Sequence, residues 1–69
     1  MWPEVLPREE VSKRLSESRW QCVKVKDFGK HSTWRTQAGF YFSVPHECTE
    51  VEFAEIMTDV NRYGWKRNV

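Results

Sequence analysis

The sequence predicts a small α+β domain in the order α-β-β-β-α, in which a three-stranded antiparallel sheet carries both helices on one face. Two amphipathic helical patterns enclose three short segments that are rich in β-branched and aromatic residues. The chain has 69 residues, which suffice for one hydrophobic core of modest size. Its four Trp, four Phe and two Tyr residues supply large side chains for such a core.

The first predicted helix starts after Pro7 and ends near Ser18. Proline suits the first turn of a helix because its missing N–H group would have no partner there, and the acidic residues that follow suit the positive end of the helix. Val11 and Leu15 are four residues apart, so we expect both to face the core. Residues 1–7, with two prolines, predict an extended arm before this helix.

Three strands are predicted in the middle of the chain, at RWQCVKVK (19–26), HSTWRT (31–36) and FYFSVP (40–45). Alternation along the first strand places Lys24 and Lys26 together on one face, which we expect to be exposed to water. Proline ends the third strand because it cannot donate to the ladder of a continuing sheet.

Two glycine-containing segments separate these strands. DFG (27–29) interrupts the first strand, because Gly29 can adopt backbone angles that are closed to other residues. QAG (37–39) predicts a short hairpin turn between the second and third strands.

The aromatic residues of the third strand should divide between the two faces of the sheet. Phe40 and Phe42 are expected on one face, and Tyr41, together with Trp34, on the other. Aromatic rings on an open face would stack on RNA bases, whereas core filling or a protein-binding patch is the alternative. Trp65 follows the last helix and is expected to fold back over the core.

The second helix carries the clearest local signal. Thr49 and Glu52 form the pattern of a capping box, and Gly64 stands where a glycine would end the helix. The apolar residues follow the spacing of one buried stripe: Phe53, Ile56, Met57 and Val60. We therefore place the core of a single domain at residues 8–64, followed by a tail of residues 65–69.

Several classes of protein do not fit this composition. No segment approaches the ~20 apolar residues of a membrane span, and the start of the chain lacks the features of a signal peptide, so we expect a cytoplasmic protein with no membrane partner. A zinc site would have to combine Cys22, Cys48, His31 and His46, whose spacing is unlike that of a zinc finger. We expect free thiols and no metal or other cofactor.

Charge is segregated along the chain although the net charge is only +1. Residues 19–46 hold five basic residues and one acidic residue, whereas residues 47–60 hold five acidic residues and no basic one. The basic segment suits an anionic partner such as RNA. Glu50, Glu52 and Glu55 suit a solvated helix face at its positive end, and a metal site is the less favoured interpretation.

His31 is the candidate for acid–base chemistry, because a histidine can exchange a proton near neutral pH. Gly29 would let a phosphate approach the backbone, and His46 is a possible accessory residue or a structural one at the strand end. The predicted phosphate-binding residues are Lys24, Lys26, Lys30 and Arg35. The alternative is that His31 is a solvent-exposed loop residue among scattered lysines.

Three motifs follow one another along the chain: the strand RWQCVKVK, the Gly29-Lys30-His31 motif, and FSVPH (42–46) before the capped helix. In this order they resemble the HicA family of small mRNA interferase toxins. The resemblance covers residues 8–64 and implies a double-stranded RNA-binding-type fold, whose element order is the one predicted above. The sequence departs from the family pattern in its near-neutral charge, its acidic second helix, and two additional residues, Asp27 and Phe28, before the glycine.

The resemblance implies that His31 is the catalytic residue of a metal-independent endoribonuclease. It would act as general acid or base while a ribose 2′-hydroxyl attacks the neighbouring phosphodiester, and Lys26, Lys30 and Arg35 would hold the phosphate. A HicB-like antitoxin would be the protein partner. The alternative hypothesis is a non-catalytic binding module, such as a phage or mobile-element protein, that engages a protein, or RNA, through its sheet and acidic helix.

Overall fold

Both predicted helices and all three predicted strands are present in the computed structural model, which describes residues 5–66. The remaining parts of the expected arm and tail, residues 1–4 and 67–69, lie outside the described residues. The elements in chain order are β1 (Val5–Leu6), α1 (Arg8–Glu17), β2 (Val23–Phe28), β3 (His31–Arg35), β4 (Tyr41–Pro45), β5 (Cys48–Thr49) and α2 (Glu50–Tyr63). The predicted α+β fold is confirmed, and β1 and β5 add a small second sheet.

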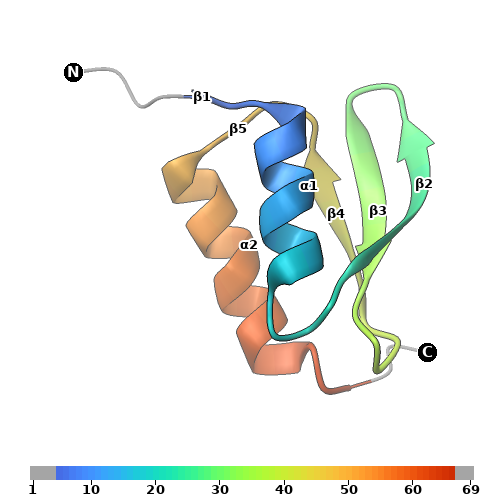
Figure 1. The fold of residues 1–69 in the computed structure, drawn as a ribbon. Coiled ribbons are helices and arrows are strands. Elements are labelled where there is room, and N and C mark those ends of the chain that lie inside the picture. The colour runs from blue at the N-terminus through green and yellow to red at the C-terminus, as the bar shows by residue number, and fades with distance from the viewer. Residues whose placement is uncertain (1–4, 67–69) are drawn as a thin grey trace.

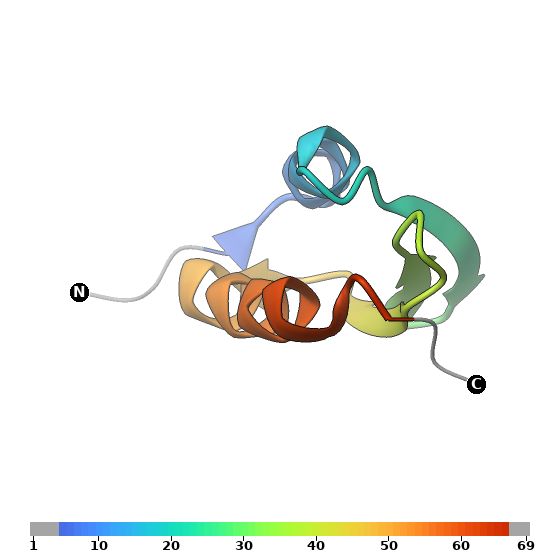
Figure 2. The same cartoon turned by 90° about the horizontal axis from the view of Figure 1, so that it is seen from below.

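The three-stranded sheet is antiparallel, with strand order β2-β3-β4. Figures 1 and 2 show that α1 and α2 lie on the same side of this sheet, which leaves its other face open. The short β1–β5 pairing joins the segment before α1 to the segment before α2. Arg14 of α1 reinforces that junction, because its guanidinium donates to the carboxylate of Glu50 at 2.8 and 3.1 Å.

The core lies between the helices and the inner face of the sheet. Its buried residues are Leu6, Val11, Leu15, Cys22, Trp34, Val44, Cys48 and Phe53. The expected position of Trp34 beside Tyr41 is wrong, because Trp34 pairs with Phe42 across β3 and β4 and both point toward the core. Phe40 and Phe42 stack on each other at 6.1 Å between ring centroids, so the expectation that they share a face is confirmed.

The first strand differs from its prediction. It begins at Val23 rather than at residue 19, and it continues through Asp27 and Phe28 instead of breaking there. The chain turns before the strand. Gln21 has a positive φ of 48°, and the backbone N–H of buried Cys22 donates to the carbonyl of Leu15 at the end of α1. A two-residue turn at 29–30 closes the hairpin.

The second helix begins at the predicted capping box. The Thr49 hydroxyl accepts from the N–H of Glu52, and the Glu52 carboxylate accepts from the N–H of Thr49. The helix ends at Gly64, where Trp20 packs against the glycine. The expectation that Trp65 folds back over the core is wrong. Its side chain is 61% exposed, and its indole N–H donates to the carbonyl of Arg62 at the end of the helix.

Candidate functional site

The open face of the sheet carries His31. Residues that pair directly across antiparallel strands share a face, and Ser32 and Trp34 are buried toward the core. Their neighbours in β3, His31 and Arg35, therefore lie on the open face. From the flanking strands the same face receives Lys26, Phe28, Tyr41 and Ser43. The only acidic residue in the three strands, Asp27, points to the other side.

His31 is held in an exposed stack at the end of the hairpin. Its imidazole ring lies on the ring of Phe28, with 5.3 Å between the centroids and 24° between the planes. The ammonium group of Lys26 lies 5.0 Å from the centroid of the same phenyl ring. The stack thus orders one basic side chain and the candidate catalytic histidine along the open face.

The predicted phosphate-binding residues do not all share that face. Lys26 and Arg35 lie on it, and Lys30 occupies the turn beside His31. Lys24 lies on the inner face, where its ammonium donates to the Asp27 carboxylate at 3.0 Å. Lys24 and Lys26 lie on opposite faces because a bulge between them adds one residue and reverses the alternation of side chains.

The turn that precedes His31 is open to solvent. No heavy atom lies within 4 Å of the position that a Cβ on Gly29 would take, and a hollow beside this turn is lined by Lys30, Pro45, His46 and Glu47. The turn does not use the positive φ that glycine permits, since Gly39 is the glycine with that conformation among residues 5–66. Gly29 therefore contributes open space next to the candidate site, as a close approach of phosphate would require.

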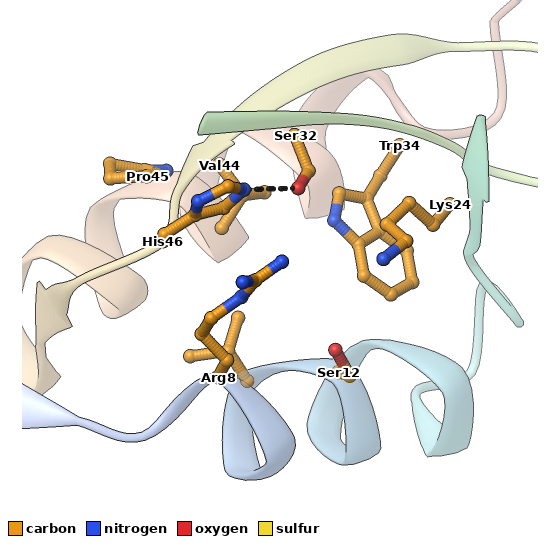
Figure 3. A pocket seen from close by; sticks show the side chains of 9 residues that line it. Arg8, Ser12, Lys24, Ser32, Trp34, Val44, Pro45 and His46 are labelled. Carbon is orange, nitrogen blue, oxygen red and sulfur yellow. Dashed lines mark hydrogen bonds between the residues drawn. The ribbon is translucent and has the colours of Figure 1, made fainter. Parts of the chain in front are cut away.

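A polar cluster occupies the inner face of the same hairpin, in a hollow between α1 and the sheet (Figure 3). The Ser32 hydroxyl donates to the Asp27 carboxylate at 2.5 Å, and it lies 2.9 Å from Nε2 of His46. His46 Nε2 is also 3.3 Å from the Asp27 carboxylate. Arg8 points into the hollow from α1, with its guanidinium 3.6 Å from that carboxylate.

The contacts around Asp27 all favour its charged form. Hydrogen bonds from Ser32 and then Lys24 hold the pKa of the Asp27 carboxyl well below its usual range, and His46 contributes in the same direction. The side chain is nevertheless 45% exposed, so solvent screens these interactions. Asp27 is therefore a permanent negative charge near neutral pH, surrounded by cationic groups on the face opposite to His31.

Ser32, His46 and Asp27 are the residue types of a hydrolase triad, but their connections are different. In a triad, histidine accepts the serine proton with one ring nitrogen and donates to the carboxylate with the other. Here Nε2 of His46 contacts both partners, and the serine hydroxyl donates to the carboxylate. A carboxylate with a strongly lowered pKa is a poor base, so Ser32 is not activated as a nucleophile.

The two histidines lie on opposite faces of the sheet end. The N–H of His46 donates to the carbonyl of Lys30 and extends the β3–β4 ladder by one position, and its ring then turns inward to Ser32. The sequence did not reveal the roles of Asp27 and Ser32. A two-residue turn at 29–30 would have indicated them, because it pairs Phe28 with His31 and therefore Asp27 with Ser32.

No metal site or membrane helix is seen among residues 5–66. No group of three His, Cys, Asp or Glu side chains in this range is arranged to hold a metal ion. Cys22 and Cys48 are both buried and free. Within the same range, no helix is long and apolar enough to cross a membrane.

The fold and the site define a small α+β domain with a basic, histidine-bearing open sheet face. Comparison with protein-family models, with curated proteins and with solved structures found no match to this chain.

Proposed function

We propose that this domain is a HicA-like endoribonuclease that cleaves mRNA without a metal ion. The observation that supports this proposal is the exposure of His31 on a sheet face whose strands present Lys26 and Arg35 and no carboxylate. The net charge of the chain does not reveal this basic face. The acidic residues of the second helix lie outside the three strands, and Asp27 points inward.

In the proposed reaction, the neutral imidazole of His31 removes the proton of a ribose 2′-hydroxyl, and the 2′-oxygen attacks the adjacent phosphorus. The bond from phosphorus to the 5′-oxygen of the next nucleotide breaks, and that oxygen takes a proton from solvent or from the imidazolium. The products are a 2′,3′-cyclic phosphate and a 5′-hydroxyl. Lys26, Lys30 and Arg35 offset the charge that develops on the phosphoryl oxygens.

The test is single-turnover cleavage of a labelled mixed-sequence RNA in the presence of EDTA. We expect His31→Ala to lower the rate by about 10²-fold or more while the circular dichroism spectrum is unchanged. Lys26→Ala should weaken RNA binding and reduce its salt dependence, whereas Lys13→Ala, an exposed lysine of α1, serves as the matched control. An inactive wild-type protein, or full activity in His31→Ala, would refute the proposal.

Exposed apolar side chains favour a protein partner on the same face. Val23, Phe28 and Tyr41 lie on the open face by their register, and they are 45%, 41% and 46% exposed. A HicB-like antitoxin that covers His31 would bury them. If the domain is instead a non-catalytic binding module, partner binding will persist in His31→Ala and RNA cleavage will be absent in the wild type.

A further inference from the structure

We infer that Asp27 and Phe28 are positioning residues for His31, one acting from each face of the β2–β3 hairpin. The inference rests on the proposed function, since it concerns the histidine assigned there to proton transfer. These two consecutive residues separate the basic part of β2 from Gly29. Neither is placed against the RNA phosphate; both act on the orientation of the imidazole.

Phe28 acts by direct contact on the open face. It is the cross-strand partner of His31 in the last pair before the turn, and the two rings stack at 5.3 Å. Residues in this position can sample several side-chain rotamers when nothing packs against them, and fixing one rotamer has an entropic cost at the moment of reaction. The phenyl ring removes that freedom in advance, because it occupies one side of the imidazole.

Asp27 acts through the backbone from the inner face. It pairs with Ser32, the position next to the Phe28–His31 pair, so its carboxylate connects β2 to β3 immediately beside the turn. His46, which follows β4, reaches the same carboxylate, and Arg8 reaches it from α1. One side chain thus joins the ends of three strands and the start of a helix.

The hairpin requires such a connection because its outer strand is poorly buried. Every residue of β2 is exposed, so apolar packing does little to prevent the strand end from fraying. The bulge between Lys24 and Lys26 is what directs Asp27 inward and leaves Lys26 and Phe28 outward. The anchor, the stacking ring and the basic side chain therefore depend on the same local geometry.

The test compares Phe28→Leu and Asp27→Asn in the full chain, with two matched controls. Tyr63→Leu removes a ring that is exposed to a similar extent, 39% against 41%, at the end of α2. Glu50→Gln removes an ion-paired carboxylate that joins α1 to α2. We expect each positioning variant to lower kcat by about tenfold with little change in KM, and both controls to retain wild-type kinetics. Phe28→Tyr should restore the rate, because it keeps a ring against the imidazole of His31.

A second measurement separates this inference from the proposed activity. The ring of Phe28 should displace the NMR resonances of the His31 imidazole protons by its ring current, and this displacement should disappear in Phe28→Leu and shrink in Asp27→Asn. If the wild type fails to cleave RNA but these shifts are found, the activity is refuted and the positioning stands. Unchanged kcat in both folded variants, or unchanged His31 resonances, would overturn the inference.

Discussion

The Ser32 hydroxyl and the Asp27 carboxylate form a 2.5 Å hydrogen bond across β2 and β3 on the inner face of the sheet. The bulge in β2 directs Asp27 inward, and this bond holds its carboxylate there, so the single acidic residue of the three strands leaves the open face without negative charge. The carboxylate is turned toward Lys24, Arg8 and His46, and the face that carries His31 keeps its basic character.

The stability of the fold should depend on the ionisation of Asp27. Its pKa in the folded protein is lower than the value of about 3.9 expected for an unfolded chain, so the folded state binds fewer protons near that pH. The stabilisation is therefore complete above about pH 5 and is lost as the pH falls below about 4. Asp27→Asn should lower Tm at pH 7 and match the wild type more closely at pH 2.

Thermal unfolding between pH 2 and pH 7 measures this effect, with Glu55→Gln as a control for an exposed carboxylate of α2 outside the cluster. Equal Tm values for wild type and Asp27→Asn at pH 7 would show that the cluster contributes nothing to folding.

The end of α2 should not tolerate a side chain at Gly64. A Cβ there would lie too close to the carbonyl oxygen of Val60 and only 3.1 Å from the Trp20 ring. Since both neighbours belong to packed parts of the structure, Gly64→Ala should cost about 1–3 kcal/mol of unfolding free energy, measured by urea denaturation. Gly29→Ala is the matched control, because nothing lies within 4 Å of its Cβ position. Equal losses in the two variants would contradict the described packing.

Both cysteines should be slow to react in the native protein. Cys22 and Cys48 are 2% and 1% exposed, and burial raises the pKa of each thiol, so the reactive thiolate is disfavoured. With a colorimetric disulfide reagent at pH 8, we expect labelling at least about tenfold slower in buffer than in urea. Rapid labelling of one thiol without denaturant would mean that its segment opens readily.

The helices were predictable because their signals are local. Val11 and Leu15 lie on one helix face by spacing alone, and the reciprocal bonds of Thr49 and Glu52 require only three intervening peptide units. The strand segments were recognisable for a similar reason, since β-branched and aromatic residues occupied them. These parts of the fold depend little on the rest of the chain.

The face of the sheet on which each strand residue lies was not predictable from local sequence. A bulge changes the side of every residue beyond it, so Lys24 and Lys26 separated although their spacing suggested one face. Trp34 lies on the inner face, where its large side chain is part of the buried core. The cluster of Asp27, Ser32 and His46 depends on the register of three strands, which the sequence does not express locally.

The most direct test of the proposed activity compares one mixed-sequence single-stranded RNA with its 2′-deoxy counterpart, both incubated with the wild-type protein in EDTA. The account predicts that the RNA is cut into fragments with 2′,3′-cyclic phosphate and 5′-hydroxyl ends, and that the 2′-deoxy strand stays intact because it lacks the attacking group. Cleavage of both strands, or of neither, would contradict it.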